Sequence, residues 1–226
     1  QGQMTKYHEL SRRAIEMARS RDLGEVAGQF AARAELRDAM AGNCGGERAT
    51  GADQFPRSNP ATIDRALALA LCGDVAGAQS LIDEQARRFP KDTILNMIWL
   101  PTVRGAMELR RNDPARAIQL LQATVNYEMG YAAGFWPVYI RGQAYLRQRA
   151  AQKAASEFQK ILDNRGAGMD SNLYPLAHLG LARALAIVGD AAQSRKSYEE
   201  FFALWKDADQ GIPVLKEARQ EYQRLP

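Results

Sequence analysis

The chain has 226 residues, 46% of them apolar, so it is long enough to bury a sizeable core in one or two domains. Its net charge is +4, from 30 basic and 26 acidic residues that are interspersed along the chain, which argues against nucleic acid as the main partner. No apolar run reaches the length of a membrane span and no signal-peptide pattern opens the sequence, so we expect no membrane insertion.

Apolar residues recur at intervals of three and four, and β-branched residues are sparse, which predicts an all-α chain without a sheet. The expected helices are separated by turn tags, in which Gly or Asn ends one helix and Asn or Asp caps the next. The tags are Gly42-Asn43, Gly73-Asp74, Asn112-Asp113 and Gly189-Asp190, with further turns at Gly2-Gln3 and near Arg149-Ala150. From Gly42 onward they lie 31 to 40 residues apart, which brackets the period of about 34 residues of the tetratricopeptide repeat.

The register of small and large residues around the tags fits the same repeat. Around Gly189 the small residues are Ala182 and Ser194, and the large one is Tyr198. Around Arg149 the small residues are Gly142 and Ala154, and the large one is Phe158. Small residues let paired helices touch, and large ones fill the gaps between them. The sequence therefore predicts one right-handed α-solenoid of tetratricopeptide-like helix–turn–helix repeats with a C-terminal capping helix.

In chain order, the expected elements begin with a half-repeat at 1–20. Five repeats follow at about 23–57, 59–90, 98–126, 136–164 and 174–206, and a capping helix ends the domain at 213–225. The least regular stretch is 42–61, because Gly45, Gly46 and Gly51 are poor helix formers and Pro56 ends a helix. We expect a short helix there from about Glu47 to Phe55.

The C-terminal stretch "KDADQGIPVLKEARQEYQRL" predicts a link followed by the capping helix. Pro213 suits a first helical position, and the apolar stripe that includes Leu215 and Ala218 would cover the aromatic face around Trp205. The charged residues of this helix, Glu217 and Glu221 among them, are expected to face water. Asp207 and Asp209 are interpreted as turn acids that bond neighbouring backbone amides, in preference to a metal site.

The two cysteines, Cys44 and Cys72, lack metal-type spacing, which predicts a reducing compartment without a disulfide framework. Cys72 is expected to be a small buried residue and Cys44 an exposed, oxidisable one. His178 is interpreted as a packing residue and His8 as a surface residue. The sequence contains no phosphate-binding loop, zinc motif or nucleophile elbow, so we predict no catalytic, cofactor-binding or metal-binding residues.

The remaining candidate site is the concave groove, which the first helix of each repeat lines in tetratricopeptide arrays. Six residues at inward-facing positions are predicted to bind a partner: Trp99, Thr102, Trp136, Tyr139, Gln143 and Arg183. Aromatic residues and arginine are enriched at binding hot spots. The alternative is that the two tryptophans only fill gaps between repeats. The Lys/Asn/Arg carboxylate clamp of chaperone-binding arrays is absent from the equivalent positions.

Several long segments carry a resemblance to a known family, among them "IWLPTVRGAMELRRNDPARAIQLLQ", "EFQKILDNRG" and "HLGLARALAIVGDAAQSRKSYEEFFALWKDAD". They resemble the C-terminal tetratricopeptide region of large bacterial multi-domain proteins, whose N-terminal part is typically a eukaryotic-like serine/threonine kinase or sometimes a winged-helix DNA-binding domain. The resemblance implies a cytoplasmic sensor or scaffold region attached to such a module. The kinase motifs themselves are absent, so no kinase activity is expected of this piece.

The leading interpretation is a non-catalytic protein-interaction module of a bacterial signalling protein, which binds a polypeptide partner or other domains of its own parent protein. The alternatives are the regulatory region of a winged-helix regulator, a small-ligand or nucleic-acid sensor, or an enzyme with an unrecognised active site in the groove.

Overall fold

The computed structural model describes residues 2–45, 59–167 and 172–226, and within these ranges every regular element is a helix. The eleven α-helices are α1 (Met4–Arg19), α2 (Gly24–Met40), α3 (Asn59–Cys72), α4 (Val75–Arg88), α5 (Leu100–Arg110), α6 (Pro114–Leu121), α7 (Trp136–Arg147), α8 (Ala151–Asp163), α9 (Leu173–Val188), α10 (Ala191–Leu204) and α11 (Pro213–Gln223). None of these helices is long and apolar enough to cross a membrane. The all-α prediction is confirmed.

Shorter elements join some of these helices. A π-helical turn, η2 (Leu95–Trp99), leads directly into α5, so this helical segment starts earlier than the expected position 98. The 3-10 turns η3 (Gln122–Thr124), η4 (Tyr131–Ala133) and η5 (Arg165–Ala167) lie in the longer connections. The helix expected from Glu47 to Phe55 falls outside the described residues.

The turn tags adopt the backbone conformation that the sequence predicts. A positive φ occurs at all six predicted positions: Gly2 (78°), Gly42 (81°), Gly73 (91°), Asn112 (61°), Arg149 (57°) and Gly189 (83°). The Asp that follows three of these residues caps the next helix, because Asp74, Asp113 and Asp190 each accept a hydrogen bond from the amide three residues later. These turns can be predicted from the sequence because the left-handed residue and the N-cap hydrogen bond each depend on only a few neighbouring residues.

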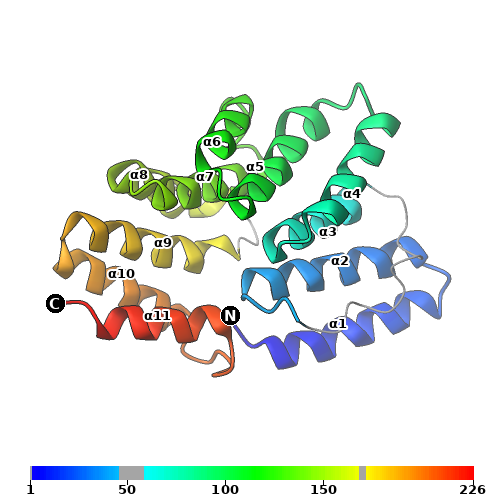
Figure 1. The fold of residues 1–226 in the computed structure, drawn as a ribbon. Helices are drawn as coiled ribbons and strands as arrows, with labels where there is room; N and C mark the ends of the chain where they lie inside the picture. The colour runs from blue at the N-terminus through cyan, green and yellow to red at the C-terminus, as the bar shows by residue number, and fades with distance from the viewer. Residues whose placement is uncertain (1, 46–58, 168–171) are drawn as a thin grey trace.

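The helices pack mainly against their neighbours in the sequence, which is consistent with helical repeats (Figure 1). The predicted small and large positions meet in the core. The ring of Phe158 on α8 lies between Gly142 on α7 and Gly180 on α9, and all three elements contact one another. A Cβ atom at Gly142 or Gly180 would come within 2.8 or 2.5 Å of that ring. Glycine at these positions is therefore what allows three helices to close around one aromatic side chain.

Replacing Gly180 by Ala is expected to lower the free energy of unfolding by about 1–3 kcal/mol, because the added methyl group overlaps a fully buried ring. Gly24→Ala is the matched control, since nothing lies within 4 Å of the place that its methyl group would occupy and alanine favours a helix. Urea denaturation of both variants measures the difference. Equal stability of the two variants would contradict this packing role of Gly180.

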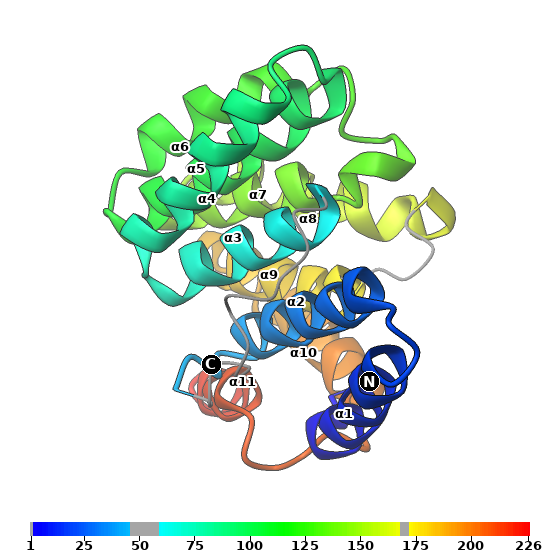
Figure 2. The same cartoon turned by 90° about the vertical axis from the view of Figure 1, so that its right-hand side faces the viewer.

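The two ends of the chain meet. The backbone N–H of Asp209 donates to the carbonyl of Gly2 at 3.0 Å, and the N–H of Val214 donates to the carbonyl of Ala41 at 3.2 Å. Figure 1 shows the N-terminus beside the start of α11, and Figure 2 shows α1, α2, α10 and α11 gathered on one side of the molecule. From the sequence we expect an open array, whereas its first and last helices are in fact tied together.

Helix α11 buries the apolar stripe that the sequence predicts for it. Leu215 and Ala218 are buried, and the ring of Tyr222 packs on Tyr198 and Phe202 of α10, with centroids 5.9 and 5.6 Å apart. Trp205 is covered partly from the other end of the chain, because its ring lies next to Gly2. The aromatic face of α10 is therefore shared between the C-terminal helix and the N-terminal residues.

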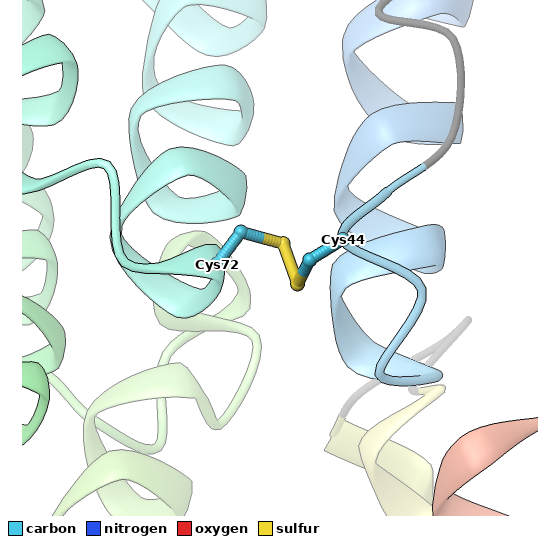
Figure 3. Close-up of a disulfide and its surroundings, with 2 residues drawn as sticks. All are labelled: Cys44 and Cys72. Atoms are coloured by element: carbon cyan, nitrogen blue, oxygen red, sulfur yellow. A yellow bond between two sulfur atoms is a disulfide. The ribbon is translucent and has the colours of Figure 1, made fainter.

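Cys44 and Cys72 form a disulfide, contrary to the prediction of two free thiols (Figure 3). Their Cα atoms are 5.3 Å apart and their sequence separation is 28. The bond joins the segment after α2 to the last residue of α3. Because disulfides persist mainly in oxidising environments, the two cysteines no longer indicate a reducing compartment.

Candidate functional site

The six residues predicted for the groove differ in how accessible they are. Thr102 is fully buried and its hydroxyl donates to the carbonyl of Ile98 within the same helical segment. Trp136 is also in the core, with 9% of its surface exposed. Trp99 and Tyr139 are partly buried against the core, and Gln143 is half-buried. The interpretation that the tryptophans fill gaps between helices therefore describes Trp136 well. Thr102 already donates its hydroxyl hydrogen to Ile98, so it cannot donate the same hydrogen to a binding partner.

Tyr139, Gln143 and Arg183 are brought together between α7 and α9. Burial raises the pKa of Tyr139, while the nearby positive charge of Arg183 and a hydrogen bond with Gln143 oppose the shift. Tyr139 also packs edge-on against Trp136 and Phe158, with ring centroids 6.2 and 6.0 Å away. Four of the six residues, Trp136, Tyr139, Gln143 and Arg183, are thus linked by contacts, and the aromatic members of this cluster also contribute to the core.

Helix α11 supplies the partners of Arg183. The guanidinium Nε lies 2.9 Å from a carboxylate oxygen of Glu221, and a terminal nitrogen lies 3.2 Å from Glu217. The hydroxyl of Tyr198 donates to the same Glu221 carboxylate at 2.9 Å. Burial and the Glu221 carboxylate both raise the pKa of Tyr198. The prediction that both acids face water is wrong for Glu221, which is bound on two sides.

A second candidate site is a cavity where the two ends of the chain meet, and we call it the end cavity. Its volume is about 260 Å³. It is lined by Gly2, Gln3, Met4, Lys6, Tyr7, Leu10, Arg37, Met40, Ala41, Asn172, Pro175, Leu176 and Trp205. These residues come from α1, α2, the start of α9 and the residues that directly flank these helices and the end of α10. Sequence reasoning missed this site because it considered only the concave groove.

Asp209 helps to hold the N-terminal wall of the end cavity in place. Its carboxylate accepts hydrogen bonds from the backbone N–H and the hydroxyl of Thr5, at 2.7 and 2.8 Å. These bonds lower the pKa of Asp209. Asp209 therefore caps the first turn of α1, whereas from the sequence we expect it to bond only within its own turn.

An exposed apolar surface lies next to this cavity, on the first two helices. Its members are each more than a third exposed: Leu10, Met17, Leu23, Val26 and Phe30. We call this set the α1–α2 surface. Within each helical segment the positions are three, four or seven residues apart, which places them on one side of that segment. Helices α1 and α2 pack against each other, and Leu10 also lines the end cavity, so the surface and the cavity are neighbours.

The two histidines are in different surroundings. His178 is half-buried and packs edge-on against Tyr174, with centroids 5.1 Å apart, and burial lowers its pKa. This agrees with the predicted packing role. His8 is more than a free surface residue, because its Nε2 lies 2.8 Å from a carboxylate oxygen of Asp38. Among the residues that the structure describes, no group of three or more His, Cys, Asp or Glu side chains could hold a metal ion.

The chain matches no protein-family model, no curated protein and no solved structure. Its function is therefore inferred from the residues themselves and their geometry.

Proposed function

We propose that this chain is a tetratricopeptide-like helical module that binds a polypeptide and serves as the interaction region of a bacterial signalling protein. The paired helices, the left-handed turn residues and the small–large packing around Phe158 support the repeat assignment. The resemblance to regions that follow a kinase or winged-helix domain supports the signalling context. In that context the binding partner is a separate polypeptide or another domain of the parent protein.

The α1–α2 surface is the observation that carries the binding function. Exposed apolar residues scattered singly are normal, but several gathered on one helix pair mark an interaction site. Apolar positions that are three, four or seven residues apart form a stripe along a helix. A partner helix with its own apolar stripe packs on such a stripe, so an amphipathic helix is the expected partner segment.

The predicted concave groove is a less accessible candidate for the same partner. Arg183 is already bound by α11, and Thr102 and Trp136 are buried. Alanine at Trp136 is therefore expected to cost stability, about 3–5 kcal/mol for a buried tryptophan, in addition to any effect on binding. The α1–α2 surface can be altered at a lower cost in stability, because its side chains are each more than a third exposed.

The test is selection of amphipathic helical peptides from a displayed library on the immobilised protein, followed by measurement of affinity. We expect selected peptides to bind with a Kd on the order of micromolar. Joint replacement of Met17 and Phe30 by Glu is expected to weaken them by at least about tenfold, while the melting temperature stays nearly unchanged. Val125→Glu is the matched control, because Val125 is 45% exposed but lies outside this surface.

Two results would contradict this proposal. One is a selection that yields no peptide with saturable binding. The other is a set of peptides whose affinity is the same for the parent protein and for the Met17→Glu, Phe30→Glu variant.

The disulfide bears on the compartment in which this module works. Cys44–Cys72 favours an oxidising location for this part of the protein over the cytoplasmic one that we expect from the sequence.

A second candidate function is that of a small-ligand sensor. It is favoured by the end cavity, whose walls come from the N-terminal helices, the start of α9 and Trp205. A ligand bound there would contact α1, α2, the start of α9 and Trp205 at once and so stabilise their association.

A further inference from the structure

We propose that the end cavity binds a small apolar carboxylate, a molecule with a ring or short hydrocarbon body and one negative charge. The inference deepens the small-ligand candidate above and does not depend on polypeptide binding at the α1–α2 surface. It rests on three features of the cavity: its size, its apolar walls and the sign of the charges around it.

The size and walls define the apolar part of the ligand. The cavity of about 260 Å³ is lined by Met4, Leu10, Met40, Leu176 and Trp205 among others. An apolar cavity of about 150 Å³ in another protein holds a benzene molecule. The end cavity therefore has room for one aromatic ring with a short substituent, and it is too small for a nucleotide or an extended peptide.

The charges define the polar part of the ligand. Lys6 and Arg37 both line the cavity, and no acidic residue of the described chain does so. The guanidinium of Arg37 lies 4.2 Å from the centre of the Tyr7 ring, which orients it without neutralising it. Within the described ranges, no carboxylate lies within ion-pair distance of Arg37. A ligand carboxylate would supply the missing negative charge.

Two acids that are next to lining residues or bonded to the same helix already have partners. Asp38, the residue after Arg37, pairs with His8 at 2.8 Å. Asp209 caps α1 through Thr5. Gln3 and Asn172, which also line the cavity, carry amide groups that can donate hydrogen bonds to a carboxylate. The site is therefore built to prefer an anion over a neutral or cationic molecule of the same shape.

The experiment is calorimetric titration of the whole chain with phenylacetate, phenylacetamide and acetate. Phenylacetate is expected to bind with a Kd below about 1 mM. Phenylacetamide has the same shape without the charge, and acetate has the charge without the ring, so both are expected to bind at least about tenfold more weakly. Trp205 lines the cavity, so its fluorescence should change with phenylacetate at the same midpoint.

Two variants locate the site. Arg37→Gln is expected to weaken phenylacetate binding by about 10- to 100-fold, because it removes a charged hydrogen-bond donor. Arg12→Gln, on the exposed face of α1 and outside the cavity lining, is the matched control and should leave the affinity unchanged. The Met17→Glu, Phe30→Glu variant should also bind phenylacetate normally, so failure of one proposal is separable from failure of the other.

A carboxylate next to an apolar group is found both in a free small acid and in the C-terminal residue of a polypeptide. An acetylated tripeptide that ends in phenylalanine with a free carboxylate distinguishes these sources. Tighter binding of this peptide than of phenylacetate would assign the site to a chain terminus, and binding of phenylacetate alone would assign it to a small acid. Absence of saturable binding by both, or equal binding of phenylacetate and its amide, would overturn the proposal.

Discussion

Replacing Arg141 by Met is expected to lower the free energy of unfolding by about 3–5 kcal/mol, because it leaves two buried carboxylates without their cation. The Arg141 side chain, on α7, is only 3% exposed. One of its terminal nitrogens lies 2.8 Å from a carboxylate oxygen of Glu128 and 2.6 Å from one of Glu157. Burial lowers the pKa of Arg141, but the hydrogen bond and charge of Glu157, joined by Glu128, outweigh it and raise the pKa.

Arg141 joins three parts of the fold through buried charges, because it lies on α7 and pairs with acids from two other segments. Glu128 lies in the long connection between α6 and α7, whereas Glu157 lies on α8. Lys160 reaches the same two carboxylates at 3.5 and 3.1 Å, but its side chain is 41% exposed. Lys160 therefore cannot replace the buried guanidinium, since an exposed charge is screened by water.

Urea denaturation at neutral pH measures this effect. Arg111→Met is the matched control, because Arg111 forms an ion pair with Glu108 at 2.6 Å but is half-exposed, and its loss should cost less than about 1 kcal/mol. A deficit equal to that of the control would contradict this account.

The parts of the fold that could be predicted from the sequence depend on short-range signals. A left-handed residue at Gly73 or Gly189 and a capping Asp after it need only one turn of chain to be recognised. The Gly142–Phe158 contact follows from the same register, because the repeat fixes which positions on paired helices meet. Period and register therefore sufficed for the all-α class and for most of the described helices, whereas the pairing predicted for repeat 23–57 depends on a helix outside the described residues.

The parts that could not be predicted depend on contacts between distant segments. Asp209 bonds Thr5 across 204 residues, and no local pattern distinguishes this bond from one within its own turn. Closure of the chain ends also determines the end cavity, so the cavity could not be predicted without it. Glu221 belongs to the polar side of an amphipathic helix by its spacing, yet the position of α11 places it against Arg183 and Tyr198.

The missed disulfide has the same origin. Cys44 and Cys72 are 28 residues apart, and the sequence-based interpretation of each depends on its immediate neighbours alone. Pairing requires their Cα atoms to approach within about 7 Å. This approach is set by the packing of α2 against α3, which spacing in the sequence does not reveal.

Reduction of this disulfide is expected to lower the free energy of unfolding by about 3–4 kcal/mol. The bond joins two residues with a sequence separation of 28 and so lowers the conformational entropy of the unfolded chain. For a loop of this size, the entropy lost by the unfolded chain corresponds to about 3–4 kcal/mol of stability. The folded state should keep its helices, because α2 and α3 also contact each other through side chains such as Leu36 and Ile63 in one core cluster. The effect should therefore appear as lower stability of the same fold.

The sequence contains only two cysteines, so a reductant has a single disulfide to act on. Urea denaturation of the parent protein with and without reductant gives the stability difference, and circular dichroism reports whether the helices remain. The Cys44→Ala, Cys72→Ala variant should match the reduced parent and should not respond to reductant. A parent protein whose stability is unchanged by reduction would show that the crosslink does not restrict the unfolded chain, and a loss of helix content would show that α2 and α3 need the bond to pack.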